Sequence, residues 1–229
     1  MGTLHPHWET LEAQDLLTRA VESYGSGLKL ACSFGAEDVA LVDLIATLKL
    51  PISLFVLDTG RLPQETYALW DRLTEHYGLP IDTYAPQTEP LQQLLQLKGP
   101  NSFYHSLENR RECCHLRKVE PLQRALKGAT GWITGQRREQ SVTRASLPKV
   151  ERDTAHGGII KLNPLADWTN ERVWDYLKRH HVPYHTLHKE GFPSIGCAPC
   201  TRAVQPGEDL RAGRWWWEKP DQKECGLHQ

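Results

Sequence analysis

Residues 28–38 read Leu28-Lys29-Leu30-Ala31-Cys32-Ser33-Phe34-Gly35-Ala36-Glu37-Asp38, an aliphatic run that passes through a small, turn-permissive sequence into an acidic helix start. A short apolar run bounded by turn residues predicts a buried strand, and the apolar spacing after it predicts a helix. The same alternation repeats along the first half of the chain. Three strands are predicted at residues 28–34, 52–57 and 81–84, with two helices between them at residues 39–48 and 65–77.

This βαβαβ order predicts an α/β fold with a doubly wound, mostly parallel sheet, because parallel neighbours need right-handed crossovers. The second half adds predicted strands at residues 131–135 and 159–162 and helices at residues 108–126 and 169–180, the last capped by Thr169. From about residue 192 the composition shifts to Gly, Pro, Cys, Trp and charge without a period. We therefore expect a single domain over residues 1–229, with an irregular C-terminal arm and tail over residues 192–229.

Composition argues against several classes of protein. The 229 residues contain no apolar stretch near the roughly 18 to 20 residues of a membrane span, and residues 1–14 lack a secretory pattern. We therefore expect no membrane association and a cytoplasmic location. Residues 1–100 carry 6 Lys and Arg against 13 Asp and Glu, a balance of −7, whereas residues 101–229 carry 21 against 15, a balance of +6. We therefore expect an anionic ligand to bind residues of the second half. A chain with a net charge of −1 is not expected to bind nucleic acid.

Three strand ends carry candidate ligand contacts, since ligands of such sheets bind beyond the carboxyl ends of the strands. Residues 33–38 lack the Gly-Lys-Ser/Thr ending of a Walker A loop, but backbone N–H groups before a helix suit a phosphate or sulfate. Residues 58–60 (Asp-Thr-Gly) suit a ribose or a base, and the arginines of residues 134–141 suit forked contacts with phosphate oxygens. Each segment, taken alone, also fits an ordinary turn and helix cap.

The six cysteines are unevenly placed, which in a reducing compartment favours metal binding or catalysis. Cys113-Cys114 is a tandem pair and Cys197-Ala198-Pro199-Cys200 is a CxxC pair, so four thiolates can converge on one metal centre. Zinc is the usual partner of four cysteines. Adjacent ligands suit a [4Fe–4S] cluster better than one small tetrahedral ion, so we favour iron–sulfur over zinc and over four unrelated buried thiols. Cys32, inside the first strand, is expected to pack as a small hydrophobe.

Cys225 lies four residues from the chain end in the polar sequence Lys223-Glu224-Cys225-Gly226-Leu227-His228. A structural thiol has little reason to occupy such a tail. Nearby basic groups would lower the pKa of the thiol and raise its thiolate fraction, which makes Cys225 a candidate nucleophile. An exposed cysteine without a role is the alternative.

Together, the segments at residues 33–38, 57–60 and 134–141, the two cysteine pairs and the terminal Cys motif resemble the assimilatory sulfonucleotide reductases. The likeness is strongest to the thioredoxin-dependent bacterial reductases of adenylyl sulfate (APS). It implies an ATP-pyrophosphatase-like (adenine nucleotide alpha hydrolase-like) fold, with Cys225 as the nucleophile. It implies [4Fe–4S] ligands at Cys113, Cys114, Cys197 and Cys200. It further implies substrate contacts by Ser33, Phe34, Gly35, Asp58, Thr59, Gly60, Lys118, Gly135, Arg137, Arg144, Arg211, Arg214 and His228.

The implied activity is the reduction of APS to sulfite and AMP in assimilatory sulfate reduction and cysteine biosynthesis. An S-sulfocysteine would form on Cys225, and thioredoxin or a similar dithiol protein would release the sulfite. We also expect a homo-oligomer. A reductase of 3′-phosphoadenylyl sulfate (PAPS) is the nearest alternative, although members of the family specific for PAPS generally lack the two cysteine pairs. An ATP-using ligase would need a Ser-Gly-Gly-x-Asp-Ser loop, which residues 33–38 do not supply. A zinc-stapled nucleic-acid-binding module is the non-enzymatic alternative.

Overall fold

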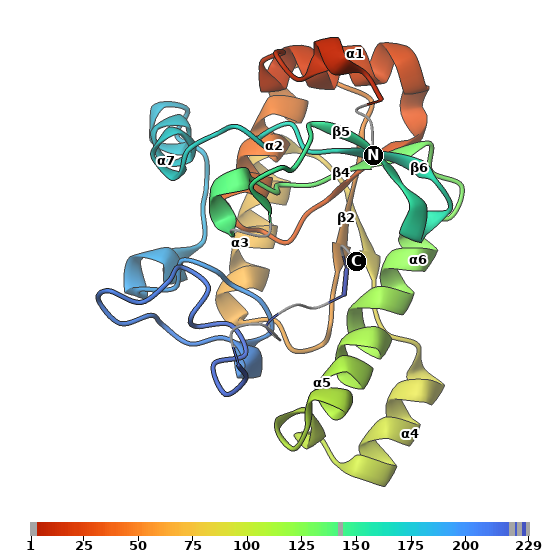
Figure 1. The fold of residues 1–229 in the computed structure, drawn as a ribbon, viewed down its shortest axis with the longest axis vertical. Helices are drawn as coiled ribbons and strands as arrows, with labels where there is room; N and C mark the ends of the chain where they lie inside the picture. The colour runs from red at the N-terminus through yellow and green to blue at the C-terminus, as the bar shows by residue number, and fades with distance from the viewer. Residues whose placement is uncertain (1–3, 142–143, 220–222, 224–225, 228–229) are drawn as a thin grey trace. The chain divides into compact units, whose positions relative to one another are not determined.

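The computed structural model describes residues 4–141, 144–219, 223, 226 and 227. Six strands form one sheet in the order β3-β2-β1-β4-β6-β5 (Figure 1). β1 is parallel to β2 and β4, β4 is parallel to β6, and β5 is antiparallel to β6 at one edge. The predicted α/β, mostly parallel sheet is therefore confirmed. The strands are β1 Leu28–Ala31, β2 Ser53–Leu57, β3 Ile81–Tyr84, β4 Gly131–Ile133, β5 Val150–Asp153 and β6 Ile159–Leu162.

The strand order reverses between β1 and β4. Successive strands extend from β1 through β2 to β3 on one side, and the chain then crosses to the other side of β1 to form β4. Leu28 pairs with Gly131 and Leu30 with Ile133, so the two strands are in register. In parallel sheets of this kind the crevice at such a switch point is the usual ligand position. The segments that follow β1 and β4 are therefore the first place to look for a nucleotide site.

The chain divides into two compact units. The sheet unit comprises Met1–Val56, Glu65–Asp82 and Gly128–His185, and the thiol unit comprises Leu57–Gln64, Thr83–Lys127 and Thr186–Gln229. The expectation that residues 1–229 act as a single domain with a C-terminal arm stays a prediction.

The core of the sheet unit is built around α2 (Ala36–Thr47), which is apolar and buried on nearly all sides. α1 (Ala13–Tyr24), α3 (Gln64–Tyr77) and α7 (Asn170–Arg179) contribute buried leucines and valines to the same core. Asp43 of α2 is buried as well, and its carboxylate accepts hydrogen bonds from the hydroxyls of Tyr77 (2.9 Å) and Tyr176 (2.5 Å). One carboxylate thus joins three helices, because a buried charge must be hydrogen-bonded to be tolerated.

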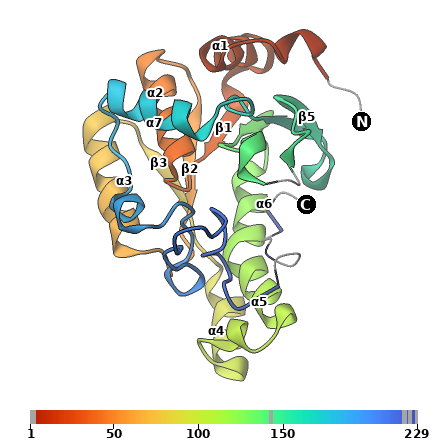
Figure 2. The same cartoon turned by 60° about the vertical axis from the view of Figure 1, so that its left-hand side comes forward.

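The thiol unit contains a long helical column with the cysteine pair in its middle. α5 (Leu107–Cys114) begins at Ser106, whose hydroxyl accepts from the backbone N–H of Asn109 at 3.2 Å. α5 continues through a π-helical turn (His115–Val119) into α6 (Glu120–Leu126), and α4 (Thr88–Lys98) lies beside α5 (Figures 1 and 2). π-helical turns inside helices are frequent at functional sites. This one begins directly after Cys114.

Most predicted elements are confirmed with shifted ends. The strand predicted to reach residue 34 ends at Ala31, because the chain turns through Phe34, whose φ of 63° lies in the left-handed region. The helix predicted at residues 108–126 is present but contains the π-helical turn. Thr169 caps α7 by accepting from the backbone N–H of Arg172 at 3.1 Å.

Besides the short 3₁₀ helices, three elements were not predicted: α1, α4 and β5. β5 has only one buried apolar residue, Val150, and therefore lacks a strand-like pattern, and α4 buries only Leu94. In the arm, the described residues form a short 3₁₀ turn, Ala198–Cys200, and one bridge between Thr201 and Arg214. None of the helices in the described ranges combines the length and apolar content that a bilayer crossing requires.

Burial, followed by the hydrogen bond to Asp43, raises the pKa of the Tyr176 phenol well above its ordinary value. Such a group contributes its full stabilisation below the unfolded pKa of about 10 and loses it as the pH rises. Tyr176→Phe should lower the free energy of unfolding at neutral pH by about 1 kcal/mol and flatten its alkaline decline. Urea unfolding at neutral pH and above about pH 10 measures both effects. An alkaline decline as steep in the variant as in the parent would contradict this account.

Candidate functional site

In the sheet unit, the loop after β1 is closed by a carboxylate. Asp38 Oδ2, in the first turn of α2, accepts from the backbone N–H of Ser33 at 2.6 Å and from its hydroxyl at 2.7 Å. The backbone N–H of Gly135, beyond β4, donates to the same carboxyl. Asp38 is buried, and burial raises its pKa to about 6, while the hydrogen bonds from Ser33 oppose the rise. Asp38 therefore ties together the two loops that flank the switch point.

The loop after β4 comes so close to the start of α2 at Gly135 that only glycine fits there. A Cβ added there would overlap Asp38 Oδ1 and lie 2.7 Å from the Cβ of Glu37, a distance that real side chains essentially never adopt. Glycine is therefore required for the loop after β4 to reach the N-terminus of α2.

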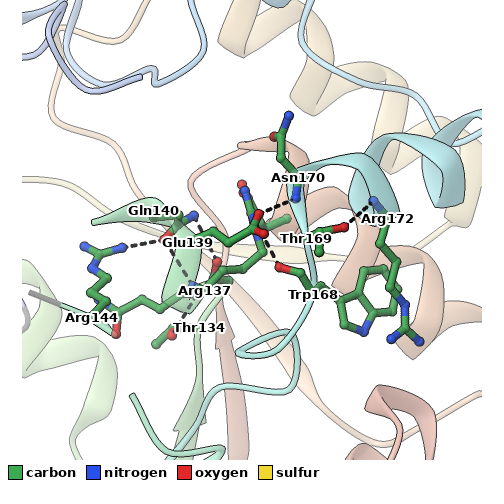
Figure 3. Close-up of polar contacts among 12 residues, drawn as sticks. Thr134, Arg137, Glu139, Gln140, Arg144, Trp168, Thr169, Asn170 and Arg172 are labelled. Atoms are coloured by element: carbon green, nitrogen blue, oxygen red, sulfur yellow. Dashed lines mark hydrogen bonds and ion pairs between the residues drawn. The ribbon is translucent and has the colours of Figure 1, made fainter. Parts of the chain in front are cut away.

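The arginine loop after β4 is fastened to the N-terminus of α7 (Figure 3). Arg137, only 2% exposed, donates from Nε to Glu37 Oε1 at 2.8 Å and from a terminal nitrogen to the carbonyl of Trp168 at 3.1 Å. Glu139 lies 3.3 Å from the same guanidinium and accepts from the backbone N–H of Asn170 at 2.8 Å. The Arg137 side chain thus orders the loop through acceptors within the protein.

The predicted contacts of the sheet unit divide into backbone and side-chain groups. The side chain of Phe34 is 1% exposed and stacks on Trp70, with ring centroids 5.7 Å apart, which leaves its backbone for a ligand. Arg144 donates to the side-chain oxygen of Gln140 (Figure 3). Ser33, Gly35 and Gly135 belong to the joined loops at the carboxyl ends of β1 and β4. Their contact with a substrate stays a prediction.

In the thiol unit, the two cysteine pairs line one small cavity. Cys113 and Cys114 come from the end of α5, and Cys197 and Cys200 come from the 3₁₀ turn of the arm. Cys113 is half-buried and the other three are buried. The four thiols therefore lie around one cavity, and their convergence on one metal centre stays a prediction. Their role as ligands stays a prediction.

The loop after β2 braces the CxxC turn. The Thr59 hydroxyl lies 3.3 Å from Cys197 Sγ, and the Thr59 carbonyl accepts from the Arg117 guanidinium at 2.5 Å. The backbone N–H of Ala198 donates to the carbonyl of Arg61 at 2.8 Å. Thr59 is 1% exposed, so its side chain serves the thiol cavity. Asp58 accepts from the backbone N–H of Gly60 at 2.9 Å, and the Gly60 φ of +66° suits this tight turn.

Burial and the basic side chains of the cavity wall act in opposite directions on the pKa values of the thiols. Burial opposes ionisation of Cys197, but the positive charge of Lys118 and the hydrogen bond to Thr59 outweigh it, so its pKa lies below the ordinary value. Burial raises the pKa of Cys200 to about 12, helped by the neighbouring thiols Cys197 and Cys114. The basic residues that line the cavity are Arg61, Arg110, Arg117, Lys118 and Arg214.

The cavity fits a [4Fe–4S] cluster by its donor chemistry. Four cysteine sulfurs are the usual ligands of such a cluster, and the surrounding cations would offset the negative charge that its thiolates and sulfides bring. Two buried donors that border the cavity, Arg117 Nε and Trp215 Nε1, have no hydrogen-bond partner among the described residues, and cluster sulfides would accept from them. In the described part of the chain, no group of three or more His, Cys, Asp or Glu is placed so that it could hold a metal ion.

The sequence analysis did not identify several residues of this cavity. Arg110 and Arg117 lie one helical turn before and after the cysteine pair, a spacing that places them on its face and could have revealed them. No local sequence pattern indicates that Trp215 lines the cavity or that Thr59 contacts Cys197. Arg211 does not line the cavity, and its backbone N–H bonds Asp209 at 2.8 Å. Two predicted residues, Cys225 and His228, lie outside the described residues.

Gly135→Ala tests the close approach of the two strand-end loops. The added methyl group would push against Asp38 and Glu37, so the free energy of unfolding should fall by about 1 to 3 kcal/mol. Gly35→Ala is the matched control, because its φ of −66° suits alanine and the nearest atoms lie 3.7 Å from the new Cβ. Denaturant unfolding compares the two variants. Equal stability of both variants would show that the approach at Gly135 is not tight.

Known proteins match this chain over most of its length. Residues 27–203 match the phosphoadenosine phosphosulfate reductase domain. The adenosine 5′-phosphosulfate reductase of Allochromatium vinosum is 51% identical over 95% of this chain and 84% of its own length, and that of Burkholderia cepacia is 52% identical over 95% and 87%. The crystal structure of phosphoadenylyl-sulfate (PAPS) reductase from Candida auris, a phosphate complex, aligns with a TM-score of 0.73 at 30% identity, over 86% of this chain and 95% of that one.

Proposed function

The chain belongs to the phosphoadenosine phosphosulfate reductase domain family, and on this premise we propose that it reduces APS to sulfite and AMP with electrons from thioredoxin or a similar dithiol protein. The curated relatives that match nearly the whole chain at about half identity are adenosine 5′-phosphosulfate reductases. The single observation that carries the choice of APS is the cavity lined by both cysteine pairs. The reaction serves sulfate assimilation, in the cytoplasm, where thiols stay reduced.

In the first step the Cys225 thiolate attacks the sulfur of APS. A sulfur–sulfur bond forms, the bond between that sulfur and the bridging phosphate oxygen breaks, and its electron pair leaves with AMP. The product on the protein is an S-sulfocysteine. A leaving phosphate needs its growing charge neutralised, and the second half of the chain carries the positive balance for this.

In the second step one thiolate of the dithiol protein attacks Cys225 Sγ. Sulfite leaves with the electron pair of the sulfur–sulfur bond, and a mixed disulfide remains. The second thiol of the donor then attacks the donor sulfur of this mixed disulfide. Cys225 is released as a thiol, and the donor leaves with an internal disulfide. The two electrons that reduce the sulfur therefore come from the donor.

The described residues supply binding and charge. In the sheet unit, the backbone groups of Phe34 and Gly35 bind the nucleotide phosphate and ribose, in a loop that Asp38 holds in place through Ser33 and Gly135. In the thiol unit, Lys118 and Arg214 supply positive charge at the cavity for the anionic end of APS. A [4Fe–4S] cluster held by Cys113, Cys114, Cys197 and Cys200 would add a fixed charge and a scaffold. The expected homo-oligomer stays a prediction.

Cys225→Ser separates the nucleophile from the cavity thiols. The iron content and the brown colour of the anaerobically purified protein should stay unchanged, because the four cavity cysteines are intact. Sulfite formation should fall to background, because a serine hydroxyl is too weak a nucleophile at neutral pH. Sulfite release with APS and a dithiol measures the effect, and Cys32→Ala, which removes a buried thiol of the sheet unit, is the control that keeps activity. Activity retained by Cys225→Ser would remove this residue from the mechanism.

Substrate choice is tested by comparing kcat/KM for APS and PAPS. The proposal predicts that APS is favoured by at least about tenfold, which corresponds to roughly 1.4 kcal/mol of discrimination at the transition state. The same protein preparation, with its iron content measured, is used for both nucleotides. A preference for the 3′-phosphorylated nucleotide would make the chain a PAPS reductase instead.

A further inference from the structure

We infer that the ion pair between Arg110 and Glu218 positions the tail that carries Cys225, so that both are positioning residues for the attack on sulfur. The inference rests on the proposed function, because it concerns the step in which Cys225 takes the sulfur. Cys225 lies seven residues beyond Glu218 in the sequence. Seven extended residues reach about 25 Å at most, so the fixed position of Glu218 limits where the thiol can go.

The ion pair between Arg110 and Glu218 is buried and bidentate, so it fixes the position of the Glu218 side chain. The Arg110 guanidinium donates from Nε to Glu218 Oε1 at 2.9 Å and from a terminal nitrogen to Oε2 at 2.8 Å. The two side chains are only 1% and 6% exposed. A forked, buried pair of this kind holds one geometry, whereas exposed pairs exchange with water. Arg110 lies on α5 one turn before the cysteine pair, and its guanidinium also hydrogen-bonds the Cys114 thiol.

The segment from Trp215 to Glu218 is held from the CxxC side as well. The backbone N–H of Trp215 donates to the carbonyl of Cys200 at 3.1 Å, and the backbone N–H of Glu218 donates to the carbonyl of Trp215 at 2.8 Å. Two guanidinium groups lie over the Trp215 ring, those of Arg110 at 4.9 Å and Arg214 at 4.7 Å from its centroid. The backbone φ of Trp215, +41°, is rare for a bulky residue, so the contacts around Trp215 must hold its backbone in this conformation.

These contacts connect both cysteine pairs to the start of the tail. Cys114 is joined through Arg110, and Cys200 is joined through the backbone of Trp215. A group that holds the four thiols together therefore also fixes the point from which the chain leaves toward Cys225. The cavity and the nucleophile are coupled through Arg110 and Glu218, although no step of the chemistry takes place on either residue.

The experiment uses full-length, iron-loaded protein mixed with excess APS in the absence of a dithiol donor. Mass spectrometry follows the sulfite mass added at Cys225 over time, and equilibrium binding gives the affinity for APS. Glu218→Ala should slow the labelling at saturating APS at least tenfold, while iron content, APS affinity and alkylation of Cys225 by iodoacetamide stay within twofold. Glu218→Gln keeps one acceptor, so its rate of labelling at Cys225 should lie between the rates of the parent and of Glu218→Ala. Glu112→Gln is the control that stays at the parental rate, because Glu112 lies on the same helix as Arg110 but pairs with Lys98 of α4 at the exposed surface.

The outcomes separate this inference from the proposed function. If the parent protein is not labelled at Cys225, the proposed function fails and the inference fails with it. If the parent is labelled and both Glu218 variants are labelled within twofold of its rate, only the inference is overturned. Loss of iron in proportion to loss of labelling also overturns it, because the pair would then serve the cavity alone. Should Glu218→Ala not be recovered with iron, the same criteria applied to Glu218→Gln decide the question.

Discussion

The thiol unit depends on one constraint, the gathering of four thiols and several buried cations in a single cavity. Cys114 and Cys197 are 83 residues apart in the sequence, yet both line it. A buried guanidinium costs free energy unless an acceptor compensates it. Arg110 has Glu218 and Arg117 has the carbonyl of Thr59, while Arg117 Nε and Trp215 Nε1 still lack an acceptor among the described residues. An electron-rich sulfur cluster would meet this need, whereas an apolar group in the cavity would not.

The two units contribute different chemistry. In the sheet unit, the parallel strands bring the loops after β1 and β4 together, and Asp38 fixes them with hydrogen bonds to Ser33 and Gly135. That arrangement offers backbone groups, which suit an uncharged ribose or a single phosphate. The thiol unit offers charged side chains and sulfurs. The charges follow this division, since the sheet unit has 13 Lys and Arg against 17 Asp and Glu, whereas the thiol unit has 14 against 11.

The fold was largely predictable because a parallel sheet leaves continuous apolar runs, and the strands at residues 81–84 and 159–162 have the predicted bounds. β5 was missed because an edge strand with one buried residue has no such run. The cysteines were found because their pairing is visible in the sequence. The structural duties of Thr59, Arg137 and Trp215 could not be found, since each depends on a partner distant in the chain: Cys197, Glu37 and Arg110. Burial of a polar group is a tertiary property that no local pattern encodes.

The metal content of the anaerobically purified protein tests the account most directly, because everything proposed for the thiols follows from what the cavity holds. The account predicts about four iron atoms and about four acid-labile sulfides per chain, all lost when Cys197 is replaced by serine. About one zinc per chain without sulfide, or no metal at all with the thiols still buried, would contradict it.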